Sequence, residues 1–398
     1  MSERLGGYGE ALMDNPNWSP DLFIGWHELH TDISLNFQLN RWAAFGGPQW
    51  LQDVRPILSK LENYEAWRSI FVSLGERAEA EGRIFHAALH FRSAEFFMSA
   101  DDPRKDPLRR RLLPMLRAAN GVPESSQREV LFRGMRLPVW QFTSEPSRRT
   151  AVIFGGFDSY IEDFFPVFTR MRREGWNVIA FEGPGQGSVL EEQHVPLTTD
   201  WHAPLGAILD DLGLDKVTLI GVSLGGCLAI RAAALEPRVH RVVAFDVLAD
   251  LFQIMTKEHP LSVAVGLRGL IAIGARRLVD KSAATIAQHN LRLEWALDQA
   301  LKVFGSATPT EALEATRKVQ TRDVSAWVTQ DVLLMAGTDD HYIPLGQLWE
   351  QARLLSSAHS ITARVFTKAE QAQAHCQVGN LPLAIRVITA WADSLDGR

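Results

Sequence analysis

The segment KVTLIGVSLGGCLAIRAAALEP, residues 216–237, decides the fold because its character changes at a single serine. Before that serine runs a short apolar stretch rich in β-branched residues, typical of a strand buried on both faces. After it, apolar residues recur at helical spacing. The glycines of GVSLG, residues 221–225, permit a sharp turn that exposes the Ser223 hydroxyl at a helix N-terminus. Backbone N–H groups there favour negative charge, so Ser223 is a candidate nucleophile, with a passive turn serine as the alternative.

Other short apolar segments lie on both sides of this one, with helical patterns such as DFFPVFTRMRREG, residues 163–175, between them. This alternation predicts an α/β fold with a mostly parallel sheet covered on both faces. The first segment contains LFRGMRLPVW and predicts an antiparallel hairpin. The predicted strands lie in residues 128–142, 150–156, 177–183, 216–223, 241–247, 331–337 and 362–368.

The remaining segments indicate two helical additions to this core. Residues 1–120 are predicted to be helical, and the stretch from Tyr64 resembles one helical hairpin, which must pack on something else to bury its face. A long, largely helical interval separates two predicted strands where a simple crossover needs about a dozen residues. Such insertions often form binding lids. We therefore expect an N-terminal region (1–120), a core in two parts (121–246 and 328–398) and a cap (247–327).

Composition narrows the classes of function. The 398 residues are 46% hydrophobic and 22% charged with net charge −6, and no basic run is dense enough to follow a phosphate backbone, so nucleic acid is not an expected partner. The first residues lack the pattern of a signal peptide, and the longest apolar stretch, 261–279, is interrupted by arginines. We expect a cytoplasmic protein without a membrane segment. Two cysteines support neither a disulfide framework nor a zinc site, and no metal or nucleotide motif is present.

A serine nucleophile needs a base and an acid that orients the base. The strand–GVSLG–helix arrangement resembles the nucleophile turn of the α/β-hydrolases, whose triad follows in the order Ser, acid, His. After the strand at 331–337, Asp340 completes the pattern G-x-x-D-x-x-x-P with Gly337 and Pro344, so we predict Asp340 as the acid. Asp339 is a competitor one residue away, and Asp246, which ends the preceding strand, is a second alternative.

Position along the sheet selects the base. His375 follows the last strand, in the loop before the final helix, which is the required place and order. His359 precedes that strand and would lie at the opposite end of the sheet. His341 adjoins the acid and is expected to line the substrate pocket. A lone histidine is usually structural or exposed, but we predict His375 as the general base.

The oxyanion hole needs two N–H donors beside the nucleophile. One is expected from Leu224, the other from Phe157 in VIFGGFDSY, residues 152–160. Gly156, Asp158 and His341 are candidate substrate contacts. FEGPGQG, residues 181–187, is not a dinucleotide fingerprint and is predicted to be a structural turn that closes one side of the pocket.

Together, the segments GGFDSYIEDFF, FEGPGQG, GVSLGG, EPRVHRVVAFDV, AGTDDHYIP and AHCQVGN, behind a helical N-terminal region, resemble one branch of the α/β-hydrolases. This branch includes the dihydroxypseudooxynicotine hydrolase of bacterial nicotine breakdown and fungal hydrolases that shorten a polyketide in pigment synthesis. The resemblance implies an α/β-hydrolase fold with a helical cap and helical N-terminal region, and places Ser223, Asp340 and His375 in the triad. Gly155 stands where many relatives carry histidine, a departure of little consequence because the donor is backbone.

By this resemblance the expected reaction is hydrolysis of a carbon–carbon bond next to a ketone, in an aromatic or polyketide-like substrate. The attacking group is either Ser223 or a water activated by His375. Ester, lactone or amide hydrolysis with the same triad is the main alternative. Cyclisation or acyl transfer, and a binding protein on a hydrolase scaffold, are further alternatives. The expected ligand is a small molecule, no cofactor or metal is expected, and a homodimer is the default oligomeric state.

Overall fold

The computed structural model describes residues 22–147, 149–256, 269, 274–287 and 290–396. Its core is an eight-stranded sheet in the order β1-β2-β4-β3-β5-β6-β7-β8. The first two strands form the predicted antiparallel hairpin, β2 also pairs antiparallel with β4, and the other neighbours are parallel. The strands are β1 (Gln127–Phe132), β2 (Met135–Phe142), β3 (Arg149–Phe154), β4 (Trp176–Phe181), β5 (Val217–Val222), β6 (Val239–Phe245), β7 (Asp331–Gly337) and β8 (Ser360–Phe366).

Helices cover both faces of the sheet. All six residues of β5 are buried, as the continuous apolar run of this strand predicts. Side chains of β3 and β5 alternate between two cores: Ile153 and Ile220 face one, Val152 and Leu219 the other. The first core is shared with α6 (Phe165–Arg173) and α16 (Leu381–Leu395), and the second with α8 (His202–Leu212), α9 (Leu224–Ala233) and α15 (Gly346–Leu354).

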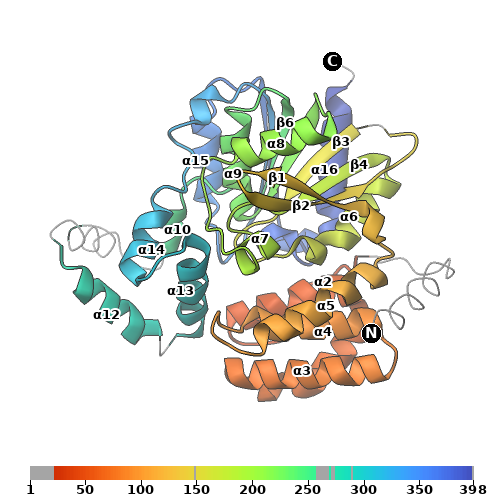
Figure 1. The fold of residues 1–398 in the computed structure, drawn as a ribbon, viewed down its shortest axis with the longest axis vertical. Helices are drawn as coiled ribbons and strands as arrows, with labels where there is room; N and C mark the ends of the chain where they lie inside the picture. Colours follow the sequence, from red (N-terminus) through yellow and green to blue (C-terminus); the bar gives the residue numbers. More distant parts are fainter. Residues whose placement is uncertain (1–21, 148, 257–268, 270–273, 288–289, 397–398) are drawn as a thin grey trace.

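The N-terminal helices form a layer at one end of the sheet (Figure 1). The predicted hairpin is present: the Asn63 side chain caps its first helix at the Ala66 N–H, 2.9 Å away, and Gly82 makes the turn at φ +76°. The two helices of this hairpin pack against the other N-terminal helices and against the core shared with α6 and α16. This packing buries the apolar face that a single hairpin would leave exposed. The layer consists of α2 (Ile33–Val54), a 3₁₀ turn (Arg55–Lys60), α3 (Tyr64–Ala80), α4 (Ile84–Phe96) and α5 (Lys105–Ala119).

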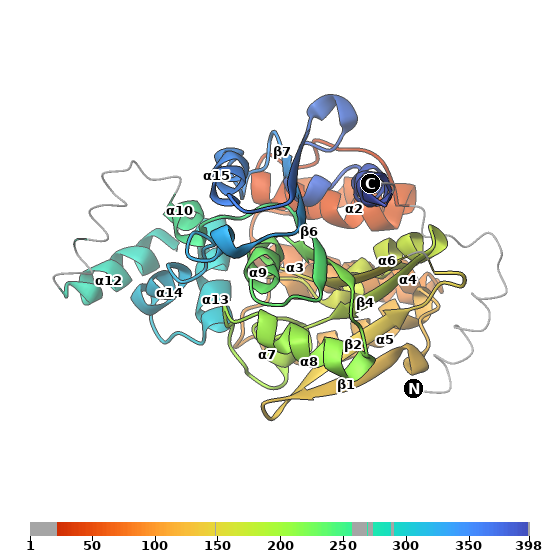
Figure 2. The same ribbon diagram turned by 90° about the horizontal axis from the view of Figure 1, so that it is seen from above.

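The interval between β6 and β7 contributes helices that lie to one side of the sheet (Figures 1 and 2). They are α10 (Leu251–Thr256), α12 (Arg276–Ala287), α13 (Leu291–Phe304) and α14 (Pro309–Thr316). Most of the apolar stretch 261–279, like residues 1–21 at the chain start, lies outside the described residues. Among the helices that are described, none has the length and apolar character needed to cross a membrane.

Short helical turns complete the connections, several of them beside the carboxyl ends of the strands. They are Glu124–Ser126, Ile161–Phe164, α7 (Gly187–Glu191), Ser325–Trp327, Lys368–Glu370 and His375–Gln377. The arrangement confirms the predicted fold class, a mostly parallel sheet with helices on both faces and a helical N-terminal region.

Candidate active site

Ser223 lies in the predicted turn between β5 and α9, in a backbone conformation that side-chain-bearing residues rarely adopt. Its φ is 60° and its ψ −121°, and its N–H donates to the Phe245 carbonyl over 2.6 Å. A Cβ at Gly221 would lie 1.9 Å from the carbonyl oxygen of Gly225. The turn therefore closes only with glycine at 221, which explains the motif in steric terms.

The structure brings three of the predicted residues into one hydrogen-bonded chain. The Ser223 Oγ lies 2.8 Å from the His375 Nε2, and the His375 Nδ1 lies 2.7 Å from the Asp340 Oδ2. The Asp340 Oδ1 accepts from the N–H groups of Tyr342 and Ile343, at 2.8 and 2.9 Å. In the neutral imidazole, a proton on Nδ1 donated to Asp340 leaves Nε2 free to accept from the serine hydroxyl.

Two of the alternative residues lie apart from this chain. Asp339 is exposed, and its N–H donates to the Gln373 carbonyl over 2.9 Å. The His359 ring is 72% exposed and bonds Asp331, the first residue of β7, which is the opposite end of the sheet as position along the strand predicts. Neither residue contacts His375 within the described hydrogen bonds.

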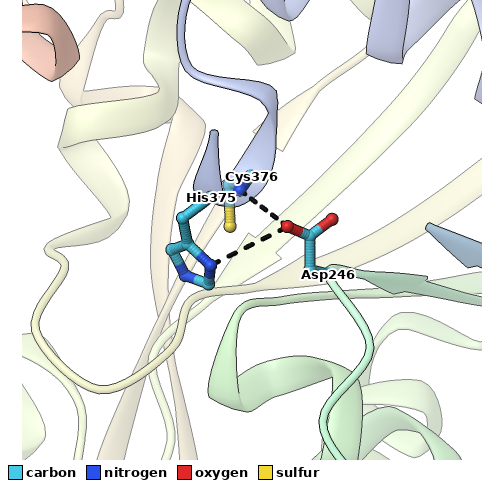
Figure 3. Close-up of side chains that lie close together, drawn as sticks. All are labelled: Asp246, His375 and Cys376. Atoms are coloured by element: carbon cyan, nitrogen blue, oxygen red, sulfur yellow. Dashed lines mark hydrogen bonds and ion pairs between the residues drawn. The ribbon is translucent and has the colours of Figure 1, made fainter. Parts of the chain in front are cut away.

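Asp246, the other alternative acid, lies close to His375 but is engaged elsewhere (Figure 3). Its Oδ2 is 3.7 Å from the His375 Nδ1, a longer separation than that to Asp340. The same oxygen accepts from the Cys376 N–H at 2.8 Å, and the Oδ1 accepts from the Gln377 side-chain amide at 2.7 Å. Cys376 and Gln377 both have φ of 49°, so Asp246 holds the strained turn that directly follows His375.

Burial and nearby charges shift the pKa values of Asp340 and Asp246 in opposite directions. Burial alone raises the pKa of Asp340, but the charge and hydrogen bond of His375 outweigh it, and the pKa lies below its usual value. Burial lowers the pKa of His375, and the Asp340 charge reverses this, so the pKa lies well above 6.5. Burial, reinforced by the charge of Asp340, raises the pKa of Asp246 to about 7. Asp340 is the ionised partner of the imidazole, and Asp246 can hold a proton near neutral pH.

Among the described residues, Asp246, His375 and Cys376 form a group whose side chains are of the types that ligate metal ions. Each offers one ligand atom, and these atoms lie within 4.8 Å of one another. All three side chains are already engaged: the Asp246 carboxylate accepts from the following turn, the His375 Nδ1 bonds Asp340, and the Cys376 Sγ donates to the Phe245 carbonyl over 3.7 Å. Burial raises the pKa of the Cys376 thiol, which disfavours the thiolate that a metal needs. These residues fit a structural role better than a metal centre.

The loop predicted to supply an oxyanion donor lies against the nucleophile turn. A Cβ on Gly156 would meet the Val222 carbonyl oxygen at 2.8 Å, the Ser223 Cβ at 2.9 Å and the Leu224 N at 3.1 Å. This approach is possible only for glycine. Leu224 is the first residue of α9, where N–H groups have no acceptor within the helix.

The GPGQG turn supports this loop from behind. The Gln186 side-chain amide donates to the Gly155 carbonyl over 2.6 Å, and the Phe157 carbonyl accepts from Gln299 of α13 at 2.6 Å. Gly185 and Gln186 line a small polar recess behind the loop and not the main cavity. The turn is thus structural, as predicted, but it braces the loop and does not itself close the pocket.

A cavity of about 260 Å³ opens beside Ser223 and His375. Gly156, Asp158 and His341, the candidate substrate contacts, lie on its wall. Most of the wall is apolar, and it is assembled from the core, the N-terminal layer and the interval between β6 and β7.

Two wall residues on α2 were missed by the sequence reasoning. The Phe37 ring lies 6.1 Å from that of His375 and 4.8 Å from that of His341. Arg41 is buried and pairs with Asp158 at 3.1 Å and with Asp163 at 3.3 Å. The signal was a single arginine within the apolar helix ISLNFQLNRWAAF, since a buried arginine requires acidic partners from elsewhere.

With the geometry described, sequence comparison decides the family. The profile of the alpha/beta hydrolase fold matches residues 153–376, more than half of the chain. The chain belongs to the α/β-hydrolase fold family. The match extends from the β3 strand to the turn that carries His375, and it includes the GVSLG turn at Ser223 of this α/β-hydrolase.

Among curated proteins, this α/β-hydrolase is similar to hydrolase acrC of Aspergillus aculeatus, with 27% identity over 67% of this chain and 69% of that protein. It is also similar to the 20-hydroxy-prefusarin hydrolase FUS2 of Gibberella moniliformis, with 32% identity over 42% of this chain and 41% of that protein. These matches confirm the resemblance to fungal hydrolases.

Two solved structures share the fold. AbyA5 has a TM-score of 0.66 at 19% identity and covers 90% of this chain and 94% of its own. The 2,6-dihydroxy-pseudo-oxynicotine hydrolase has a TM-score of 0.55 at 22% identity, over 80% of this chain and 84% of its own. At these identities the likeness extends to the fold, including the helical N-terminal region.

Proposed function

We propose that this α/β-hydrolase cleaves a carbon–carbon bond next to a ketone by hydrolysis, in an aromatic or polyketide-like 1,3-dicarbonyl substrate. Ser223 is the nucleophile, His375 the base and Asp340 the acid. The observation that carries the proposal is the hydrogen-bonded chain from Asp340 through His375 to Ser223, at the wall of a largely apolar cavity. The names of the similar hydrolases agree with a small-molecule substrate.

The first step is attack on the substrate carbonyl. His375 Nε2 takes the proton of the Ser223 hydroxyl as Oγ bonds to the carbonyl carbon, and Asp340 stabilises the imidazolium that forms. The carbonyl oxygen becomes an oxyanion beside the N–H groups of Leu224 and Phe157. Those donors lie at a helix N-terminus and in the loop pressed against it, where negative charge is favoured.

Collapse of this intermediate breaks the carbon–carbon bond. The electron pair leaves on carbon as an enolate, and the imidazolium of His375 returns its proton to that carbon. Water activated by His375 then hydrolyses the acyl-serine, so that one water yields an acid and a ketone or phenol. The raised pKa of His375 strengthens its imidazole as a base toward the serine hydroxyl, and the carbanion is far more basic than imidazole, so the imidazolium can still protonate it.

We further propose that the helical segments enclose this reaction. Phe37 of α2 reaches the His375 ring, and residues of α10 and α13 line the opposite wall, so 247–327 would act as a cap and the N-terminal layer as part of the lid. Exclusion of water strengthens the fixed dipoles around the oxyanion and protects the enolate.

The decisive experiment incubates the wild type and Ser223→Ala with aryl 1,3-diketones and, in parallel, with short-chain nitrophenyl esters, and identifies products by mass. We expect diketone cleavage to an acid plus a ketone or phenol, reduced at least a thousandfold in the variant. Turnover of esters alone would replace the proposal with an esterase. Full activity of Ser223→Ala would remove the serine from the mechanism.

A further inference from the structure

The cavity beside Ser223 has a branch that the proposed reaction does not itself require. On one side the wall faces α10 and α13, through Leu251 and Trp295. Other residues of the wall come from β3, β5, α6 and α16. The helices α6 and α16 contact each other on one face of the sheet (Figures 1 and 2). Ile153 and Ile220, paired neighbours on β3 and β5, form the floor of this branch.

Helical spacing shows how far this inner branch extends. Leu381, Ile385 and Ile388 line it at positions i, i+4 and i+7, which share one face of α16. Val167 and Met171 line it from α6, one turn apart. At 1.5 Å per residue, the span from Leu381 to Ile388 is roughly 10 Å, two helical turns into the core.

The chemistry of the branch is uniform. The side chains that α6, α16, β3 and β5 contribute to it are aliphatic or aromatic, and Ile385 and Ile388 are at most 2% exposed. These side chains are therefore shielded from bulk water, and they line the same cavity as Ser223 and His375. An apolar void forfeits dispersion contacts when empty and favours hydrocarbon over water.

We propose that this inner branch binds an unbranched hydrocarbon arm carried by the carbonyl group that Ser223 attacks. The inference rests on the proposed function, because it takes Ser223 as the reacting group, and it narrows the substrate class. The substrate is a ketone with an extended apolar chain, whose carbonyl stays beside Ser223 while the chain lies between the sheet, α6 and α16. The remaining, bulkier part of the substrate lies toward the cap.

The test measures binding without turnover. Straight-chain methyl ketones from butanone upward are titrated calorimetrically into the Ser223→Ala protein. Burial of each added methylene should tighten binding about fourfold until the branch is filled, after which longer ketones gain nothing. In the same background, Ile385→Phe should move that limit to a shorter chain, and Met171→Ala should move it to a longer one.

Ala390→Phe is the matched control, because it adds a ring on the exposed side of the same helix and should leave the limit unchanged. Should Ile385→Phe fail to fold, Met171→Ala carries the test alone, since it removes atoms. An affinity that ignores chain length, or a limit that neither variant moves, overturns the proposal. Chain-length-dependent binding by a protein that cleaves no diketone would instead preserve the branch and reject the proposed reaction.

Discussion

At the residue scale, two carboxyls compete for one imidazole, and distance and hydrogen bonding distinguish them. Asp340 lies 2.7 Å from the His375 Nδ1 and Asp246 lies 3.7 Å away. Each oxygen of Asp246 also accepts a hydrogen bond from the turn that follows His375. The shorter contact, together with the lowered pKa, favours Asp340 as the group that holds the catalytic tautomer.

Replacement of Asp340 tests this assignment. Asp340→Asn keeps the shape but presents an amide to the imidazole and removes the charge that stabilises the imidazolium. We expect kcat to fall by roughly 10³–10⁴ with little loss of folding. The control is Asp339→Asn, one residue away and exposed, which should retain nearly full activity in the same product assay. Equal losses in the two variants would contradict the role of Asp340.

The pH profile should follow the ionisation of His375. The base works only when neutral, and the pKa of the imidazole is raised above 6.5, chiefly by Asp340 against the opposing effect of burial. Activity should therefore be lost as pH falls through that raised pKa, so the midpoint of the acid limb of kcat/KM should lie above pH 6.5. In Asp340→Asn the limb should shift to lower pH, measured on the residual activity. A midpoint below 6.5 in the wild type would show that the imidazole is not held in this way.

At the scale of elements, the end of β6 supports the turn that carries the base. Asp246 follows β6 directly, and its two oxygens accept from two donors of the 3₁₀ turn at His375–Gln377. This link joins a central strand to a turn with two consecutive left-handed residues, which would otherwise be unfavourable for side-chain-bearing residues. The position of the His375 ring thus depends on an acid that need not take part in the reaction.

Asp246→Ala tests the support. The methyl side chain offers no acceptor, so the Cys376 N–H and the Gln377 side-chain amide both lose their buried partner. The free energy of unfolding should fall by about 1–3 kcal/mol, measured by urea denaturation. The loss in kcat should be smaller than in Asp340→Asn. A variant as stable as the wild type would show that the 3₁₀ turn at His375–Gln377 does not need Asp246 to keep its conformation.

At the scale of the whole molecule, a cluster of buried charged side chains joins the N-terminal layer to the loop that contains Phe157 and Asp158. Arg92 of α4 is 2% exposed and bonds the Asp163 carboxylate at 3.0 Å, the Glu95 carboxylate at 2.6 Å and the Asp158 carbonyl at 2.8 Å. Arg41 of α2 reaches two of the same residues, Asp158 and Asp163. The layer is therefore anchored through charge beside the site as well as through apolar packing.

Removal of one partner from this cluster should be costly. Arg92→Met removes the buried cation that Asp163 and Glu95 share, leaving Asp163 only Arg41 and Glu95 only Lys105, and we expect a loss of about 3–5 kcal/mol in the free energy of unfolding. Arg104→Met removes ion pairs of an exposed arginine in the same layer, where the expected loss is about 0–1 kcal/mol. Urea denaturation compares the two variants. Similar losses would mean that the cluster contributes no more than surface pairs do.

The sequence by itself determined the seven strand segments (the first a hairpin of two strands), their α/β alternation, the glycine-flanked turn at Ser223 and the candidates for acid and base. These features depend on neighbouring residues: short continuous apolar runs, helical patterns, glycines at a tight turn, and position relative to a strand end. The predicted helical N-terminal region and long insertion also follow from such patterns.

The sequence favoured Asp340 through its pattern with Gly337 and Pro344, but only the tertiary structure showed which acid lies against His375, because direction and distance separate Asp340 from Asp339 and Asp246. It also brought Phe37 and Arg41 to the cavity, and opened the branch between α6 and α16. These results depend on contacts between segments far apart in the chain. Side-chain direction across such contacts is set by packing of the whole core, and no local pattern records it.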